Sequence, residues 1–472
     1  MNSASTDYDV IVIGAGGAGM TAAITAAKNG ARVALLEAWD RVGGSTALSG
    51  GYLYATGTKQ QKAQAVDDSP ERMYEDIRAL NGDSIPEPVL RRFIKESADT
   101  VAWVESLGVK FPTEYCVSPD GIMPARAHAP EGNGLSITEK LDLEVNRCGI
   151  DLALNTRVQE LLKDDTGAVT GVRLPDGDIS AGAVIIACGG IGGDPALLDE
   201  HCPKTKRNGD WRWYVGCQTN RGDGLRLTQA VGGKVSGKDS GLFLMTPNFH
   251  RDLEVIGPAW VMMVNSRGER IMREDGAYWA VSEALEAQPD GRAFAVFSHE
   301  QMLAAEPDPR VLQAIADGTI TLNWTPEVLT AQQGAGRVLK ADTLAELGRQ
   351  AGLDPAKLEA ATERYNRLAK EGNDVDFGKD SAAMQAILEP PFYAVEVRPA
   401  LAIVTGAGPA IDGSARVLSD SGGIVPGLYA AGETTGNVYG RYYVGSGYAI
   451  NSALTFGRVA GQEAASFALQ NN

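Results

Sequence analysis

Apolar and polar positions along the chain predict an α/β fold built on buried parallel strands. The first apolar run, Tyr8–Gly14, is β-branched and ends in glycine, which is typical of a parallel strand buried on both faces. An alanine-rich helix follows and stops at Gly30, and a second strand covers Arg32–Glu37. The runs Ala183–Ala187 and Gly427–Gly432 repeat the apolar pattern with a glycine at the end. Together these runs predict a parallel sheet whose strands come from distant parts of the chain.

A helical pattern occupies the region between the last two of these strands. Residues 341–355 and 358–368 carry apolar side chains at helical spacing, and a glycine and an Asp-Pro pair separate them. We expect two amphipathic helices here. They indicate that a second structural region interrupts the sheet.

The turn after the first strand has the spacing of a dinucleotide-binding site. Gly14, Gly16 and Gly19 form G-x-G-x-x-G between strand and helix, and Glu37 ends the second strand 18 positions beyond Gly19. The glycines let backbone N–H groups and the helix N-terminus approach a pyrophosphate, while the carboxylate accepts hydrogen bonds from ribose hydroxyls.

Three further small-residue loops favour FAD over NAD. The loop Asp40–Gly51 directly follows the ribose-binding strand and suits a cofactor that continues past the first pyrophosphate. Gly189 and Gly190 end the third strand, and Glu433 is placed to hold a ribityl hydroxyl. The residues predicted to contact FAD are Gly14, Gly16, Gly17, Ala18, Gly19, Glu37, Ala38, Gly43, Gly44, Ser45, Thr46, Ser49, Gly50, Gly51, Val158, Ala187, Gly189, Gly190, Asp223, Gly432, Glu433, Ser452 and Leu454.

The amino-acid composition limits the kinds of partner that the protein is expected to bind. Of 472 residues 56 are glycine, many of them in these loops, and the net charge of −17 repels polyphosphate backbones, so nucleic acid is not an expected partner. Five scattered cysteines and four histidines show no disulfide framework and no metal-ligand spacing, and a reducing cytoplasm fits them best. The N-terminus lacks a signal-peptide pattern, and the apolar stretch 10–27 contains four glycines, so we expect no membrane span.

With these loops in place, the chain resembles the flavoprotein family of soluble fumarate reductases and 3-ketosteroid dehydrogenases, from Tyr8 to Gly461. The resemblance implies a discontinuous Rossmann-like FAD domain, residues 1–237 and 391–472, with an inserted α+β cap domain, residues 238–390, and substrate between them. Some relatives attach FAD to a histidine where this chain has Ser45, so the resemblance implies noncovalent FAD.

The resemblance also indicates which branch of the family the candidate catalytic residues match. Fumarate reductases use an arginine proton donor shortly after a G-x-R-F-x-N-E segment, here residues 268–274, whereas ketosteroid dehydrogenases have a catalytic tyrosine at the position of Tyr278. The paired-histidine segment of the reductases is replaced by Ala402–Gly406, which has no histidine. The loop Gly440–Gly447 resembles the ketosteroid dehydrogenase loop in which a tyrosine and a glycine four residues later bind the ketone, which selects Tyr443 and Gly447.

Ketone desaturation gives these residues a chemical rationale. Removal of the α-proton places charge on the carbonyl oxygen, which a Tyr O–H and a backbone N–H stabilise by roughly 3–4 kcal/mol per donor. Tyr278 would take the proton, and because a free phenol titrates near pH ~10 it needs an activating neighbour, for which Tyr115 is the best match. Tyr278 and its neighbour Trp279 also fit a simple packing role, and Arg441 fits either a surface position or a contact with a substrate carboxylate.

The sequence therefore predicts an FAD-dependent dehydrogenase that introduces an α,β double bond into a cyclic ketone and passes electrons to an external acceptor. The substrate is either a 3-oxosteroid or a smaller ring such as cyclohexanone or 4-oxocyclohexanecarboxylate. Ketosteroid dehydrogenases tend to be longer than this chain, which favours the smaller ring. Two alternatives stay open, an enoate reductase running in the opposite direction and a flavin-binding electron-transfer subunit. The oligomeric state stays open as well.

Overall fold

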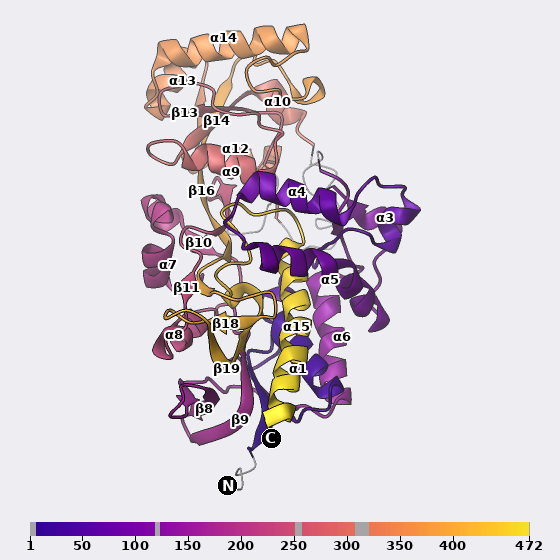
Figure 1. The fold of residues 1–472 in the computed structure, drawn as a ribbon. Coiled ribbons are helices and arrows are strands. Elements are labelled where there is room, and N and C mark those ends of the chain that lie inside the picture. The colour runs from indigo at the N-terminus through magenta and orange to yellow at the C-terminus, as the bar shows by residue number, and fades with distance from the viewer. Residues whose placement is uncertain (1–5, 119–122, 251–256, 307–320, 472) are drawn as a thin grey trace. The chain divides into compact units, whose positions relative to one another are not determined.

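The computed structural model describes residues 6–118, 123–250, 257–306 and 321–471 (Figure 1). Its contacts divide the chain into two units, each assembled from separate segments. Unit 1 contains Met1–Pro203, Gly216–Leu242 and Val404–Asn472, and unit 2 contains Lys204–Val215 and Phe243–Ile403. The predicted domains, 1–237 with 391–472 and 238–390, stay a prediction, because contacts within one chain do not show which parts fold alone.

Unit 1 is built on a sheet with the strand order β18-β19-β9-β1-β2-β6, extended from β9 by β8 and β7. Strands β19, β9, β1, β2 and β6 pair in parallel with one another, which makes the fold a Rossmann-like α/β fold, while β18 and β8 join this core antiparallel. The bounds are β1 Tyr8–Ile13, β2 Val33–Leu36, β6 Asp151–Ala153, β7 Glu160–Lys163, β8 Val169–Leu174, β9 Gly177–Ile186, β18 Arg416–Leu418 and β19 Ile424–Ala430. The side chains of residues 10–13 are buried, as an apolar strand covered on both faces requires.

The first and last helices of unit 1 pack closely against each other (Figure 1). A Cβ atom at Gly457 of α15 would lie 2.6 Å from the Ala18 carbonyl oxygen of α1, and one at Gly461 would lie 2.3 Å from that of Ala22. Glycine at these two positions therefore permits the close approach of the two helices. The helices of the unit are α1 Gly17–Lys28, α2 Gly44–Ala47, α3 Lys59–Ala63, α4 Pro70–Asn81, α5 Glu87–Ser106, η1 Thr113–Tyr115, α6 Asn133–Arg147, α7 Pro195–His201, α8 Asp223–Ala230, η5 Gly432–Thr434 and α15 Tyr448–Asn471.

Two small sheets complete unit 1. The first has the order β3-β5-β4, with β3 Leu53–Tyr54, β4 Cys116–Val117 and β5 Ala127–His128. The second pairs β11 Val235–Ser236 with β17 Gly408–Pro409.

Unit 2 is built on a sheet with the order β10-β16-β14-β13, and β12 and β15 also pair with β16. Alternate side chains of its strands enter two different cores, as the two-residue period of a strand requires. Val264 and Phe294 pack with Leu358 of α14, while Met263 and Ala295 pack with Leu285 of α9. The elements are η2 Pro203–Trp211, β10 Trp213–Tyr214, β12 Gly241–Thr246, β13 Met262–Asn265, α9 Tyr278–Glu286, β14 Ala293–Ser298, α10 His299–Leu303, α12 Pro326–Gly334, β15 Val338–Ala341, α13 Leu344–Ala351, α14 Pro355–Glu371, η4 Ser381–Ala383 and β16 Phe392–Thr405.

The predicted amphipathic helices are confirmed as α13 and α14 (Figure 1). Thr343 caps the first and Asp354 caps the second by accepting hydrogen bonds from backbone N–H groups of the first turn. Gly352, in the left-handed region at φ +72°, ends α13. Among the described helices, none is long and apolar enough to cross a membrane.

Candidate functional site

The glycine turn between β1 and α1 is closed by contacts that leave no room for side chains. Gly14 has φ +102°, and a Cβ there would lie 2.5 Å from the Ala187 carbonyl oxygen. A Cβ at Gly19 would lie 1.8 Å from the Gly14 carbonyl oxygen. By contrast, a Cβ at Gly16 would meet no atom closer than 3.9 Å, so the turn is open at this position. This arrangement fits a pyrophosphate that approaches the N-terminus of α1.

Glu37 lies at the end of β2 with both carboxylate oxygens engaged. The N–H of Ala15 donates to Oε2 and that of Trp39 donates to Oε1, each at 2.7 Å. These bonds fix the carboxylate beside the glycine turn, and Ala38 follows it half-buried. A carboxylate oxygen has two lone pairs, so it can also accept bonds from a ribose hydroxyl.

The second loop lies against the first through a bridge between Gly16 and Gly43. Gly43 has φ +111° and Gly44 begins the short helix α2. A Cβ at Gly17 would lie 2.6 Å from Thr46 Oγ1, which places this hydroxyl over the start of α1. Farther along the loop, Ser49 Oγ donates to the Thr46 carbonyl and accepts from Gly51 N–H, with Gly50 between them.

Ser45 joins this loop to a segment that the sequence reasoning missed. Its hydroxyl oxygen accepts from Cys217 N–H at 3.0 Å and from Asn220 Nδ2 at 3.1 Å. Asn220 also reaches Glu433 Oε2 at 3.4 Å. Residues so far apart in sequence give no local pattern, so their contact was not predictable from spacing.

Glu433 is fixed beside the third glycine pair. Thr405 donates to its Oε1 through both the backbone N–H and Oγ1, each at 3.0 Å. A Cβ at Gly190 would lie 2.2 Å from Thr405 Oγ1 and 2.6 Å from Glu433 Oε1, and one at Gly189 would lie 2.2 Å from Asn220 Oδ1. The polar side chains thus fill the space beside these two glycines.

The remaining predicted cofactor contacts lie on several other segments of unit 1. Gly432, with φ +85°, and Leu454 contact the start of α1, and Ser452 is buried in α15. Val158 is buried beside Arg157, which forms an ion pair with Asp223 at the start of α8. Burial raises the pKa of Asp223, against the opposing effect of Arg157.

Tyr443 and Gly447 meet at the N-terminus of α15. The Ala449 N–H donates to Tyr443 Oη at 3.0 Å, and the Gly447 carbonyl accepts from Asn451 N–H in the first turn. Gly447 has φ +92°, and within the described ranges no acceptor is recorded for its N–H. Tyr443 is buried, and burial raises the pKa of its phenol well above the ordinary value, so the hydroxyl keeps its proton at neutral pH.

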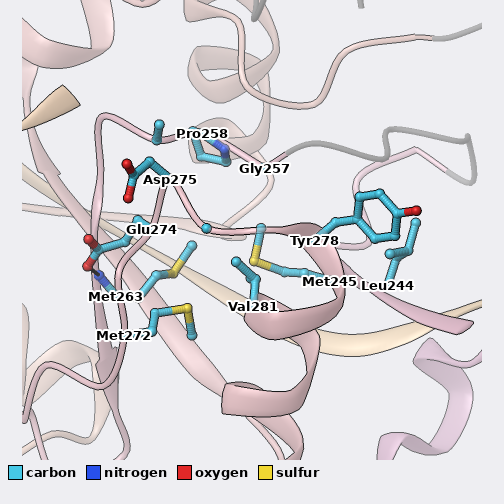
Figure 2. A pocket seen from close by; sticks show the side chains of 12 residues that line it. Leu244, Met245, Gly257, Pro258, Met263, Met272, Glu274, Asp275, Tyr278 and Val281 are labelled. Carbon is cyan, nitrogen blue, oxygen red and sulfur yellow. Dashed lines mark hydrogen bonds between the residues drawn. The ribbon is translucent and has the colours of Figure 1, made fainter. Parts of the chain in front are cut away.

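Tyr278 begins α9 and lines a pocket of unit 2. Glu274 and Asp275 lie at one side of this pocket. The other lining residues carry no charge and are Leu244, Met245, Gly257, Pro258, Ala259, Met263, Met272, Gly276 and Val281. Figure 2 shows the Tyr278 ring directed away from the two carboxylates. The pocket therefore has a mainly apolar lining, with the two carboxylates at one side and the Tyr278 side chain at the other.

Glu274 belongs to a buried cluster of charges that sequence reasoning did not find. Arg270 forms ion pairs with Glu274 and with Asp374, each at 2.9 Å, and Lys379 Nζ lies 3.1 Å from Glu274 Oε2. Lys379 Nζ also donates to the Tyr365 hydroxyl at 2.9 Å. These four charges are balanced, two positive and two negative.

Tyr115 and Arg441 lie in less enclosed positions. Tyr115 is half-buried in η1, where its carbonyl accepts from Ala129 N–H. Arg441 is exposed and its guanidinium lies 5.0 Å from the centre of the half-buried Tyr442 ring. Of the two interpretations of Arg441, a surface position and a contact with a substrate carboxylate, the structure favours the surface position.

The glycine turn on a parallel sheet and the carboxylate at the end of β2 define an α/β protein that binds a dinucleotide cofactor. The sequence profile of the FAD binding domain family matches residues 9–450, so the chain belongs to this family and its cofactor is FAD. The chain is an FAD-dependent oxidoreductase of the fumarate reductase and ketosteroid dehydrogenase family that acts on carbon–carbon bonds.

The chain is similar to members of both branches. It is 33% identical to a fumarate reductase (cytochrome) of Shewanella frigidimarina, over 98% of this chain and 78% of the relative. It is 31% identical to a urocanate reductase of Eggerthella lenta, over 98% and 75%, and 24% identical to a 3-oxosteroid 1-dehydrogenase of Mycobacterium tuberculosis, over 96% and 97%. These identities establish the family and leave the substrate open.

Solved structures from both branches of the family also match the chain. A 3-ketosteroid-Δ4-(5α)-dehydrogenase of Rhodococcus jostii in complex with 4-androstene-3,17-dione matches with a TM-score of 0.79 and 26% identity, over 98% of both chains. A flavocytochrome c3 fumarate reductase in an open conformation matches with a TM-score of 0.70 and 28% identity, over 98% of this chain and 78% of that one. Since this ketosteroid dehydrogenase has nearly the same length as the chain, length does not separate the two substrate classes, and the smaller ring stays a prediction.

Proposed function

We propose that the protein is an FAD-dependent dehydrogenase that introduces a double bond next to the carbonyl of a cyclic ketone. The observation that carries the proposal is the arrangement at the start of α15, where the Tyr443 hydroxyl oxygen accepts the Ala449 N–H and Gly447 directly precedes the helix. Two hydrogen-bond donors at one helix N-terminus suit a carbonyl oxygen on which negative charge develops.

Tyr443 has the properties of a donor. Its oxygen already accepts the Ala449 N–H, and an oxygen that accepts a hydrogen bond becomes a stronger donor through polarisation. Burial keeps the phenol protonated at neutral pH. In the proposed reaction Tyr443 Oη and Gly447 N–H hold the ketone oxygen and stabilise the enolate as the α-proton leaves.

The proposal assigns the proton acceptor to Tyr278 Oη. The apolar wall of its pocket excludes water from the ring of the substrate, and Tyr115 is the proposed partner that passes the proton on. The glycine turn and Glu37 would hold FAD, which would supply an acceptor for the hydride of the neighbouring carbon. The proton and the hydride leave as a pair, so the ketone loses two hydrogens and the acceptor gains two electrons.

The residues of this chain favour the ketone over an unsaturated dicarboxylate. The arginine that fumarate reductases use is replaced by Tyr278, and residues 402–406 contain no histidine. Arg441, the candidate partner for a substrate carboxylate, is exposed and lies against Tyr442. The rival function is enoate reduction, which the 33% and 31% identities to reductases favour.

The electron acceptor and the location of the enzyme complete the proposal. Reoxidation needs an external acceptor, because the cysteines lack the spacing of an iron–sulfur site or a haem attachment. All five cysteines are free thiols, which suits a reducing cytoplasm.

Anaerobic mixing separates the two functions. Holoenzyme is mixed with cyclic ketones of increasing size, from cyclohexanone to a 3-oxosteroid, and flavin absorbance is followed. We expect one ketone class to bleach the oxidised flavin. No bleaching by any ketone, together with oxidation of the reduced enzyme by fumarate or urocanate, would assign the protein to the reductases.

Two variants test the assigned tyrosines. Tyr443→Phe removes one donor to the enolate and should lower the rate of ketone-dependent flavin reduction about 10²–10³-fold. Tyr278→Phe should abolish the reaction while FAD stays bound. Tyr442→Phe is the matched control, because its half-buried ring neighbours Tyr443 and has no assigned role, and it should retain the wild-type rate.

A further inference from the structure

The loop that carries Tyr443 is attached to a helix that lies far away in the sequence. Asn81, the last residue of α4, donates from Nδ2 to the Tyr442 carbonyl at 3.0 Å, and its Oδ1 accepts from the Tyr442 N–H at 2.8 Å. One side-chain amide thus pairs with both backbone groups of the residue before Tyr443. Asn81 is 7% exposed, so water competes little for these bonds.

Neighbouring contacts strengthen the attachment. The hydroxyl of Ser84 accepts from Arg441 N–H at 3.1 Å and donates to the Asn81 carbonyl at 2.7 Å. Gly440 has φ +71°, and a Cβ there would lie 2.5 Å from Asn81 Oδ1. Glycine at this position therefore allows the loop to approach the amide closely.

The other end of the loop is fixed independently. The Gly447 carbonyl accepts from Tyr54 N–H at 3.2 Å and from Asn451 N–H at 2.9 Å. Asn451 in turn donates from Nδ2 to the Tyr54 carbonyl at 2.7 Å. Tyr443 lies between the two fixed ends, so its hydroxyl depends on both for its position.

We propose that Asn81 is a positioning residue that sets the Tyr443 hydroxyl for the ketone oxygen. The inference rests on the proposed function. Asn81 does not need to touch the substrate, because it acts through the backbone of Tyr442. A displacement of about 1 Å at a reacting group can cost on the order of 10²-fold in rate, so the loss of this attachment should be visible in turnover.

Asn81→Asp is the sharpest variant. Aspartate keeps the size and the acceptor for Tyr442 N–H, but it lacks the Nδ2 donor and turns a carboxylate oxygen toward the Tyr442 carbonyl. Asn366→Asp is the matched control. Asn366 on α14 makes the same two bonds to the backbone of Ile387, each at 2.7 Å, and the proposed function gives it no role.

Three measurements are made on the holoenzymes: kcat/KM with the ketone, the primary deuterium isotope effect at its α-carbon, and hydrogen exchange of residues 440–447. We expect Asn81→Asp to lower kcat/KM at least tenfold, to raise the isotope effect because proton removal becomes slower, and to speed exchange of the loop. Asn366→Asp should leave kcat/KM within twofold of wild type and the loop exchange unchanged.

The outcomes separate the two proposals. Unchanged loop exchange in Asn81→Asp, or faster exchange with unchanged kcat/KM, overturns the positioning role, and so does an equal loss in Asn366→Asp. If wild-type enzyme reduces its flavin with no ketone, the proposed function fails. The exchange comparison then still decides whether Asn81 holds the loop.

Discussion

Replacing Lys379 by methionine should strongly destabilise unit 2. The Lys379 side chain is fully buried, and its Nζ donates to the Val261 carbonyl at 2.8 Å and to the Tyr365 hydroxyl at 2.9 Å, beside Glu274 at 3.1 Å. Methionine has similar length but no charge and no donor. The cluster of two cations and two anions would become negative, with Arg270 as its only remaining cation.

The magnitude follows from burial. Removing one partner of a buried ion pair typically costs 3–5 kcal/mol, because the other charge stays buried without compensation. Burial itself lowers the pKa of Lys379, which Glu274 opposes, so the ammonium depends on its partner. Glu274 keeps Arg270 and the Met263 N–H, which places the expected loss at the lower end, about 3 kcal/mol.

Urea unfolding followed by tryptophan fluorescence measures this loss, because five of the seven tryptophans belong to unit 2: Trp211, Trp213, Trp260, Trp279 and Trp324. With a slope of about 3 kcal/mol per M, the midpoint should fall by about 1 M. Lys357→Met is the control, since its ion pair with Glu269 is exposed and should contribute less than about 1 kcal/mol.

A double-mutant cycle with Glu274→Gln decides the cause. If the buried charge explains the loss, the variant lacking both charges should be more stable than the sum of the single losses predicts, by at least about 1 kcal/mol. Additive losses, or a loss in Lys379→Met no larger than in Lys357→Met, would refute the reasoning.

Two further predictions concern the cofactor site and the buried phenols. Gly190→Ala should weaken FAD binding at least tenfold, measured as flavin retained per protein, because its Cβ would lie 2.2 Å from Thr405 Oγ1. Gly334→Ala is the control and should retain FAD, because a Cβ there meets nothing within 4 Å. Equal retention of FAD by the two variants would contradict the argument. Burial raises the pKa of Tyr54 and of Tyr429 to about 12. Above pH ~10 the unfolded chain therefore holds fewer protons than the folded chain, so the free energy of unfolding falls as the pH rises from ~10 toward ~12. Thermal melts across this range should show the decline, and a constant melting temperature would contradict it.

Elements with a local pattern were predictable from the sequence. The strands β1, β2, β9 and β19 and the helices α13 and α14 each carry a local pattern of apolar positions, caps or glycine stops, which does not depend on distant residues, whereas the short strand β6 was not predicted. The position of Glu37 beside the glycine turn was predictable as well, because one strand–helix–strand unit sets its distance from the turn, while its contact with a ribose stays a prediction.

Contacts between distant polar residues were not predictable. Asn81 and Tyr442 are separated by 361 residues, and Ser45 and Asn220 by 175. An asparagine at the end of a helix usually faces water, so nothing in its local sequence marks it as the partner of a distant loop. Lys379 was missed for the same reason, since a lysine is seldom fully buried and its partner Glu274 lies in another segment.

The close packing of α1 on α15 sets an order for biosynthesis. The glycine turn leaves the ribosome well before α15, and the small-residue face of α1 meets Gly457 and Gly461 only after more than 400 further residues have been translated. Until then the nucleotide site lacks the helix that supports it. FAD insertion should therefore be a late event that follows synthesis of α15, and a nascent chain arrested before Gly457 should not retain the flavin.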